Sequence, residues 1–121
     1  MGASHPVYKK LQELPVLDTA HHTGSKQVFS TGRKDLTRIT QVAFGRLLVG
    51  ETIPAHAHPD MDECFYITVG KGEIKINGVS YVLEAGVYVE VPAGSLHELN
   101  CSESELGFFY FGLQVYSPTG Y

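Results

Sequence analysis

The chain has 121 residues, of which 43% are hydrophobic, and a formal net charge of −4 at pH 7. A chain of this length forms one domain that buries about two thirds of the surface that its unfolded form exposes. The negative charge offers no basic surface for nucleic acid. No apolar run approaches the roughly 20 residues that a membrane span requires, and the N-terminus lacks a signal-peptide pattern. We therefore expect a cytoplasmic globular protein without a nucleic-acid partner or a membrane association.

The first 25 residues lack the alternating pattern of the rest and are expected to form an N-terminal extension. Within them, residues Val7 to Leu14 favour one short helical turn at most, which Pro15 would end. Residues 18–25 are typical of a loop, and they include His21 and His22, which we expect to lie on the surface. The remaining residues, 26–121, are expected to form the folded domain.

From residue 26 onward, the alternation of apolar and polar side chains predicts strands and almost no helix. The strands are predicted at residues 27–31, 38–49, 63–69, 73–76, 79–83, 87–91, 97–101 and 106–116. The pair Asn77-Gly78 predicts a two-residue hairpin turn of type I′, and Gly70-Lys71-Gly72 predicts a tight corner between two strands. Short strands at near-regular spacing favour an all-β fold, either a double-sheet jelly roll or a small barrel.

Four residues have the types and spacing of a metal site: His56, His58, Glu63 and His97. His56 and His58 are two residues apart, so on an extended strand both imidazoles leave the same face. The turn-forming step Pro59-Asp60 lets the chain return Glu63 to that face. Three neutral imidazoles and one carboxylate suit one divalent transition metal ion, such as zinc, iron, manganese, nickel or cobalt. Glu63 is also a candidate general base beside the ion.

These residues lie in two glycine-framed segments that resemble the two motifs of the cupin superfamily. Residues Gly50 to Gly70 fit the pattern G-x5-H-x-H-x3/4-E-x6-G, and residues Gly86 to His97 fit G-x5-P-x-G-x2-H. The asparagine that the family places next in the second motif is replaced by Cys101. The resemblance implies a small single-domain cupin of the "cupin 2" type, which is a double-stranded β-helix or jelly-roll barrel with the four residues as metal ligands.

The resemblance leaves the reaction open. One hypothesis is an enzyme that acts at the metal on a small polar organic substrate, with dioxygenase, decarboxylase or isomerase chemistry. The other is a non-catalytic module that holds a metal and a small ligand, because no clear general acid or base is visible beyond Glu63. The sequence alone does not choose between them.

Strand parity predicts which side chains share the interior with the metal. Phe65, Ile67 and Val69 follow Glu63 on the same strand face, whereas Cys64 lies on the opposite one. The side chains expected to line a ligand pocket are Arg46, Phe65, Ile67 and Tyr110.

The final strand, residues 106–116, is apolar on both faces. A strand of this kind is usually covered twice, and we expect a second subunit to supply one of the covers, which predicts a homodimer. The two cysteines, Cys64 and Cys101, can form one disulfide at most and are expected to stay reduced.

Overall fold

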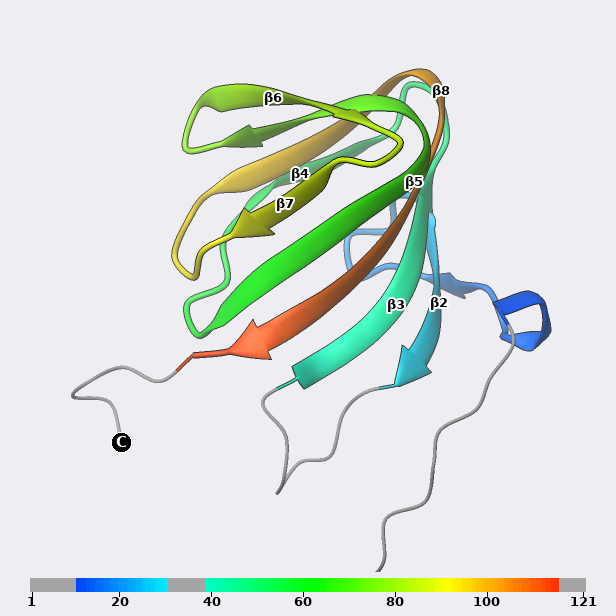
Figure 1. Ribbon diagram of the computed structural model, residues 1–121, viewed down its shortest axis with the longest axis horizontal. Helices are drawn as coiled ribbons and strands as arrows, with labels where there is room; N and C mark the ends of the chain where they lie inside the picture. The colour runs from blue at the N-terminus through cyan, green and yellow to red at the C-terminus, as the bar shows by residue number, and fades with distance from the viewer. Residues whose placement is uncertain (1–10, 31–38, 116–121) are drawn as a thin grey trace, which may run out of the picture.

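The structure is a computed structural model, and it describes residues 11–30 and 39–115 (Figure 1). Its strands are β1 (Leu17–Asp18), β2 (Ser25–Ser30), β3 (Ile39–Leu47), β4 (Thr52–His56), β5 (Met61–Ile76), β6 (Val79–Glu84), β7 (Tyr88–Val91) and β8 (His97–Gln114). The only helix in the described part of the chain is a 3-10 turn, Leu11–Glu13. The all-β prediction is confirmed. The expected helical turn is seen in part, since residues 7–10 lie outside the described residues.

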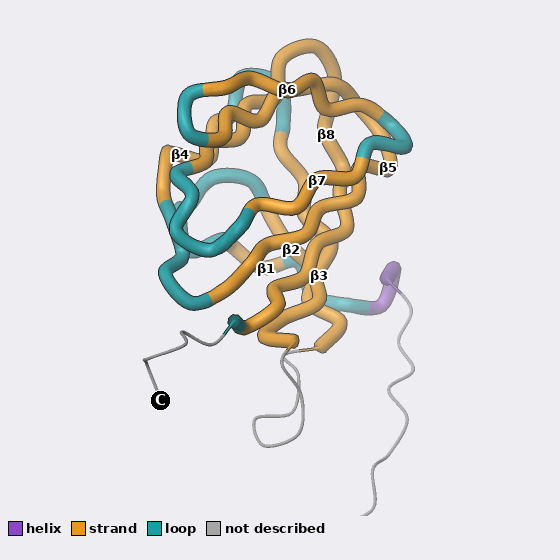
Figure 2. Tube along the Cα trace, turned by 60° about the vertical axis from the view of Figure 1, so that its left-hand side comes forward, coloured by secondary structure: helices purple, strands orange, loops and turns teal. Residues whose placement is uncertain are grey.

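Two long antiparallel strands, β5 and β8, organise the fold by passing through both of its layers. Residues 61–69 of β5 and 106–113 of β8 lie in one layer, where β7 pairs with β5 and β3 pairs with β8, followed outward by β2 and β1. Residues 71–76 and 97–100 lie in the other layer, where β6 pairs with β5 and β4 pairs with β8. Both long strands curve from one layer into the other (Figures 1 and 2). This is the predicted double-sheet jelly roll.

The core lies between the two layers and is aliphatic at its centre. Its fully buried large side chains include Leu47, Ile67, Ile74, Leu83, Leu99 and Leu106. Burial of one such side chain contributes about 1.5–3 kcal/mol relative to exposure. Because these residues come from both layers, they hold the layers together.

The hairpin predicted at Asn77-Gly78 is confirmed. Both residues have positive φ, 49° and 85°, as a type I′ turn requires. The flanking residues Ile76 and Val79 are paired across it.

The prediction that a corner at Gly70-Lys71-Gly72 separates two strands is wrong. Strand β5 runs unbroken from Met61 to Ile76, and the register of its pairing with β8 shifts between Ile67 and Gly72 instead. Gly70, with φ 95°, lies in this shift, where a Cβ atom would collide with the backbone of Glu105. A β-bulge of this kind bends a strand without ending it, so the two strands predicted at each end form one. The shift also changes the side-chain parity, which leaves Val69 56% exposed although the alternation placed it inside.

Three further differences concern strands whose presence or bounds the periodicity did not predict. Residues 97–101 and 106–116 were expected as separate strands, but they form the single strand β8. Strand β4, Thr52–His56, was not predicted, because Pro54 interrupts its pattern. In the stretch expected to be loop, Leu17 and Asp18 pair with Lys26 and Ser25.

No helix in the described part of the chain is both long and apolar enough to cross a membrane.

The outward face of β8 is covered in part by the same chain, since the ring of Phe29 on β2 lies 5.9 Å from the ring of Phe109. Both cysteines are buried and free, as expected. The homodimer stays a prediction.

Candidate metal centre

The four predicted ligands come together at one end of the barrel. His56 ends β4 and is paired directly with His97, which begins β8. Glu63 is the third residue of β5, and His58 lies in the turn between β4 and β5. One potential ligand atom from each of the four residues lies within 4.8 Å of the others. Elements that are distant in sequence therefore converge on one spot that has the size of a metal site.

Backbone contacts between the two glycine-framed segments fix this convergence. The amide of Gly94 donates to the carbonyl oxygen of His58 at 2.8 Å, and the amide of Ser95 donates to Pro92 at 3.1 Å. With Gly94 at φ 84°, residues 92–95 form a turn whose third residue needs positive φ, the geometry of type II. The amide of Ala93 also donates to Oδ1 of Asp62 at 2.8 Å. The loop before His97 is thereby held against two residues that precede Glu63, His58 and Asp62.

The orientation of two of the imidazole rings is set by backbone carbonyl groups. Nδ1 of His56 lies 2.8 Å from the oxygen of Pro54, and Nδ1 of His97 lies 3.0 Å from the oxygen of Ser95. A carbonyl oxygen only accepts hydrogen bonds, so each Nδ1 carries the proton. In the neutral ring, the lone pair is then on Nε2, which is the arrangement that prepares a histidine for metal coordination.

The carboxylate of Glu63 lies among these nitrogen atoms. Its Oε1 atom is 3.1 Å from Nε2 of His97 and 3.5 Å from Nε2 of His58. Nε2 of His58 is buried and has no hydrogen-bond partner. Neutral Nε2 atoms and a carboxylate oxygen are all acceptors, so their proximity is favourable only with a proton or a cation among them. The donor set therefore fits a divalent metal ion, whose identity three nitrogen atoms and one oxygen atom do not determine.

The environment shifts the pKa values of two rings in opposite directions. Burial disfavours the charged form of His97, but its hydrogen bonds to Glu63 and to the carbonyl of Ser95, with the charge of Glu63, raise its pKa above the usual 6.5. Burial lowers the pKa of His56, and the hydrogen bond to Pro54 offsets this only in part. Without a metal, a proton is therefore held preferentially between His97 and Glu63.

A cavity of about 190 Å³ opens next to this cluster. Phe65, Phe108 and Tyr110 form an aromatic wall, with ring centroids 5.6 to 5.8 Å apart. Burial, with a contribution from the charge of Glu63, raises the pKa of Tyr110 to about 12, so its hydroxyl keeps its proton at neutral pH. The predicted pocket residues Phe65 and Tyr110 both line this cavity.

The other two predicted pocket residues have different positions. Arg46 lines the cavity, but its guanidinium donates to Oε1 of Gln27 at 2.6 Å and lies over the ring of Phe44. Arg46 and Phe44 are two residues apart on β3, so their side chains lie on the same face of the strand. Ile67 is fully buried in the core and is not part of the cavity wall.

The N-terminal segment supplies wall residues that the sequence did not reveal. Thr19, His21 and Lys26 line the cavity, and the ring of His21 lies 4.4 Å from the ring of His56. His21 was expected to be a surface residue with no connection to the ligands. Its side chain is exposed, yet the turn between β1 and β2 brings it over the cluster. No spacing signal could have revealed this, because only the pairing of β2 with β3 places the turn there.

The family follows from the sequence and from this architecture together. Residues 43–111 match the Cupin domain family. This protein is a cupin. Over 72 residues the cupin is 35% identical to the quercetin 2,3-dioxygenase of Bacillus subtilis, a match that covers 58% of this chain and 20% of that enzyme. The chain thus spans a small part of the length of this relative.

Solved structures show the same fold at low sequence identity. A predicted oxalate decarboxylase from Thermotoga maritima is 17% identical and has a TM-score of 0.78, covering 88% of this chain and 97% of its own. An RmlC-like cupin from Shewanella frigidimarina is also 17% identical, with a TM-score of 0.75 and coverage of 90% and 92%. KdgF from Halomonas sp. is 14% identical, with a TM-score of 0.72 and coverage of 88% and 91%.

Proposed function

We propose that this cupin binds one divalent transition metal ion through His56, His58, Glu63 and His97, and is an enzyme that acts there on a small polar organic substrate. The chemistry would be of the dioxygenase, decarboxylase or isomerase type. The observation that carries the proposal is the buried, unpartnered Nε2 of His58, which faces a carboxylate shared with His97. A group left in this state costs free energy unless the site is completed by a ligand.

When bound, such an ion supplies a Lewis acid that polarises a substrate oxygen. The residues of the chain prepare the site for it. The carbonyl groups of Pro54 and Ser95 keep the Nδ1 protons of His56 and His97 in place, which presents both Nε2 lone pairs without reorganisation. The aromatic wall excludes water from one side of the cavity, and this strengthens electrostatic interactions inside it.

Two residues could handle protons in the reaction. Glu63 has its Oε1 atom nearest to the rings of both His58 and His97, and as a base it would take up a proton at the other carboxylate oxygen. The neutral phenol of Tyr110 serves as a hydrogen-bond donor toward a substrate oxygen, because its pKa of about 12 keeps the proton on the hydroxyl.

The relatives support an enzyme without choosing the reaction. The most informative sequence match is to a quercetin 2,3-dioxygenase, and one similar structure is a predicted oxalate decarboxylase. The cavity of about 190 Å³ is smaller than the roughly 300–1,000 Å³ of typical ligand pockets. This size favours a substrate smaller than most ligands of such pockets.

The test is elemental analysis of the purified protein, followed by a substrate panel of small carboxylic acids, diketones and enediols with the metal that it retains. We expect one metal ion per chain and turnover that chelation abolishes. A His97→Ala variant with undiminished metal stoichiometry and affinity would refute the metal site. Full metal occupancy with no turnover across the panel would favour the alternative, a non-catalytic module that holds metal and ligand.

A further inference from the structure

One lysine, Lys26, belongs to the cavity wall. Lys26 on β2 is paired with Gly45 on β3, and directly paired residues point to the same side of a sheet. At Gly45 that side is the interior, because a Cβ atom there would lie 2.6 Å from the ring of Phe108. The side chain of Lys26 therefore enters the cavity, as its place in the cavity wall also indicates.

Within the described part of the chain, Lys26 has no ion-pair partner. The other cation of the wall, Arg46, is engaged with Gln27 and lies 3.7 Å from Glu105. Among the described residues of the wall, Glu63 is the one acidic residue, and its Oε1 atom already lies against two imidazoles. The ammonium group of the half-buried Lys26 is therefore free to form a charge-assisted hydrogen bond with an anionic ligand in the cavity.

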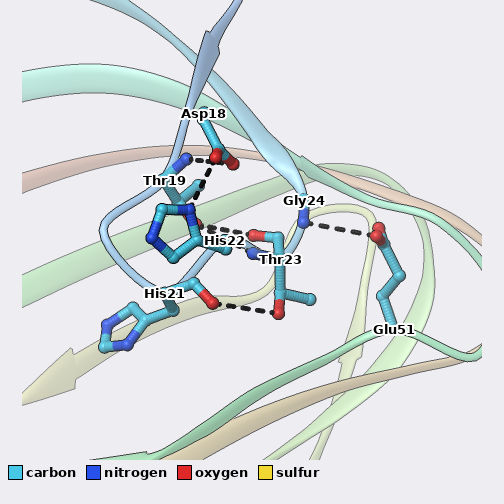
Figure 3. A network of polar contacts seen from close by, with 7 residues as sticks. All are labelled: Asp18, Thr19, His21, His22, Thr23, Gly24 and Glu51. Atoms are coloured by element: carbon cyan, nitrogen blue, oxygen red, sulfur yellow. Dashed lines mark hydrogen bonds and ion pairs between the residues drawn. The ribbon is translucent and has the colours of Figure 1, made fainter.

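A second part of the chain, the turn between β1 and β2, lies over the same cavity. The turn between β1 and β2 is tied by the contact of His22 Nδ1 with Asp18 Oδ2 at 2.7 Å and by two hydrogen bonds between Thr19 and Thr23 (Figure 3). The amide of Gly24 donates to Oε2 of Glu51 at 3.3 Å, which anchors the end of the turn to the barrel.

This turn leaves one of its two imidazoles unused. His22 is turned toward Asp18, whereas the ring of His21 lies apart from the network (Figure 3). It is placed instead beside His56 at the cavity. No hydrogen bond of the His21 side chain occurs within the described part of the chain, so both ring nitrogens are available to a ligand.

We infer that the cavity binds a small organic anion, a carboxylate or an enolate with an apolar body. The ammonium group of Lys26 pairs with the negative charge of this ligand, and the imidazole of His21 lies over it. The aromatic wall of Phe65, Phe108 and Tyr110 takes the apolar part. The inference rests on the proposed function and narrows its substrate to an anion. In this role Lys26 and His21 bind the ligand and not the metal, since neither is among the four residues that converge on the metal position.

The experiment measures binding of benzoate by calorimetry to the metal-loaded wild-type protein and to four variants, Lys26→Met, Lys26→Arg, Lys71→Met and His21→Ala, with metal content determined in each sample. Lys26→Met keeps an unbranched side chain as far as the Cε position and removes the charge, and Lys26→Arg keeps the charge. Lys71→Met is the matched control, since Lys71 pairs with Glu84 on the surface and does not line the cavity. Benzamide serves as the neutral counterpart of benzoate.

We expect Lys26→Met to weaken benzoate binding about 10- to 100-fold, the effect of losing one charge-assisted hydrogen bond. Lys26→Arg should retain most of the affinity, Lys71→Met all of it, and benzamide should not distinguish Lys26→Met from the wild type. His21→Ala should also weaken benzoate binding, and unchanged affinity in that variant would remove His21 from the site. No benzoate binding to the wild type, or equal affinity in Lys26→Met, would overturn the inference.

The same samples separate this inference from the proposed function. If the wild type binds no metal but still binds benzoate through Lys26, the metal proposal fails and the anion site stands. If the wild type binds one metal ion and Lys26→Met leaves benzoate affinity unchanged, the anion site fails and the metal proposal stands. A melting temperature of Lys26→Met close to that of Lys26→Arg shows that the loss is not one of folding.

Discussion

Nε2 of His97 lies 3.1 Å from Oε1 of Glu63, in a ring that is only 1% exposed and whose Nδ1 already faces the carbonyl of Ser95. In the metal-free protein this contact is favourable when a proton lies between the two atoms, and the raised pKa of His97 favours the imidazole as its carrier. A bound cation would replace that proton. Proton and metal therefore compete for one position, and the first two predictions rest on this competition.

The Glu63→Gln variant distinguishes the role of Glu63 in metal binding from its role in the metal-free protein. The amide group of glutamine can donate to Nε2 of neutral His97, so the metal-free variant should be as stable as the wild type. Its metal affinity should fall by at least about 10- to 100-fold, because a charged ligand becomes neutral. Competition with a metal-binding dye measures the affinity, and Glu73→Gln on the same strand is the control. Equal affinity in Glu63→Gln and wild type would exclude Glu63 as a ligand.

Metal uptake should release a proton, and the raised pKa of His97 determines the pH range in which this release occurs. Its pKa lies above 6.5, so its protonated form persists to higher pH than that of a free histidine. Affinity should therefore rise with pH through the raised value, while His56, with its lowered pKa, is already neutral there. Calorimetry in two buffers of different ionisation enthalpy counts the proton. Proton release that is absent just above pH 6.5 would contradict the assignment.

The same pKa shift affects the stability of the metal-free protein. A folded-state pKa above the unfolded one means that protonated His97 stabilises the fold below pH 6.5, and that this contribution is lost as pH rises through the folded value. The lowered pKa of His56 acts oppositely, and its contribution is lost as pH falls through its own folded value. In a His56→Ala background, urea unfolding should therefore show stability that declines as pH rises above 6.5. A stability that increases there would reverse the sign of the argument.

Removal of the metal should leave the protein folded. The buried core joins the two layers through apolar side chains other than the four ligands, so chelation should remove only the binding contribution, about 2.7 kcal/mol when free ion exceeds its dissociation constant a hundredfold. Circular dichroism melts with and without chelator should both be cooperative, with a lower midpoint for the chelated protein. Unfolding at 25 °C on chelation would show that the ion has a structural role, which would weaken the case for chemistry.

Gly45 provides a test of the cavity wall. A methyl group at this position would lie 2.6 Å from the Phe108 ring, so Gly45→Ala should destabilise the protein by about 1–3 kcal/mol through overpacking. The cost should shrink in a Phe108→Leu background, where the ring is absent. Urea unfolding of the two single variants and the double variant measures this coupling. Equal cost in both backgrounds would show that Phe108 does not lie over Gly45.

We expect a homodimer, as proposed from the apolar faces of the final strand. The outer surface carries further apolar side chains, with Tyr66, Val82 and Tyr88 each about half exposed. A second copy of the chain is the simplest cover for such a surface. Light scattering at micromolar concentration should give about twice the chain mass of 13.3 kDa. A mass of 13.3 kDa would remove the dimer.

Local chemistry and spacing were enough to predict part of this molecule. The turn at Asn77-Gly78 follows from two residues that tolerate positive φ, and the inward position of Phe65 follows from its separation of two from Glu63. The two glycine-framed segments also predicted that His56, His58, Glu63 and His97 would converge, and the structure brings them together. In each case the determining interaction lies within a few residues or within a repeated motif.

Tertiary structure decided what depends on pairing between distant strands. The register shift at Gly70 joins two expected strands and turns Val69 outward, because the partner strand sets where a bulge forms. Arg46, predicted for the pocket, does line the cavity, but the contacts of its guanidinium group with Gln27 and Phe44 depend on the pairing of β2 with β3. Lys26 and His21 reach the cavity only because β2 pairs with β3. Strand register decides on which side of a sheet a side chain lies. Register depends on contacts between segments that are distant in sequence, and no local pattern encodes it.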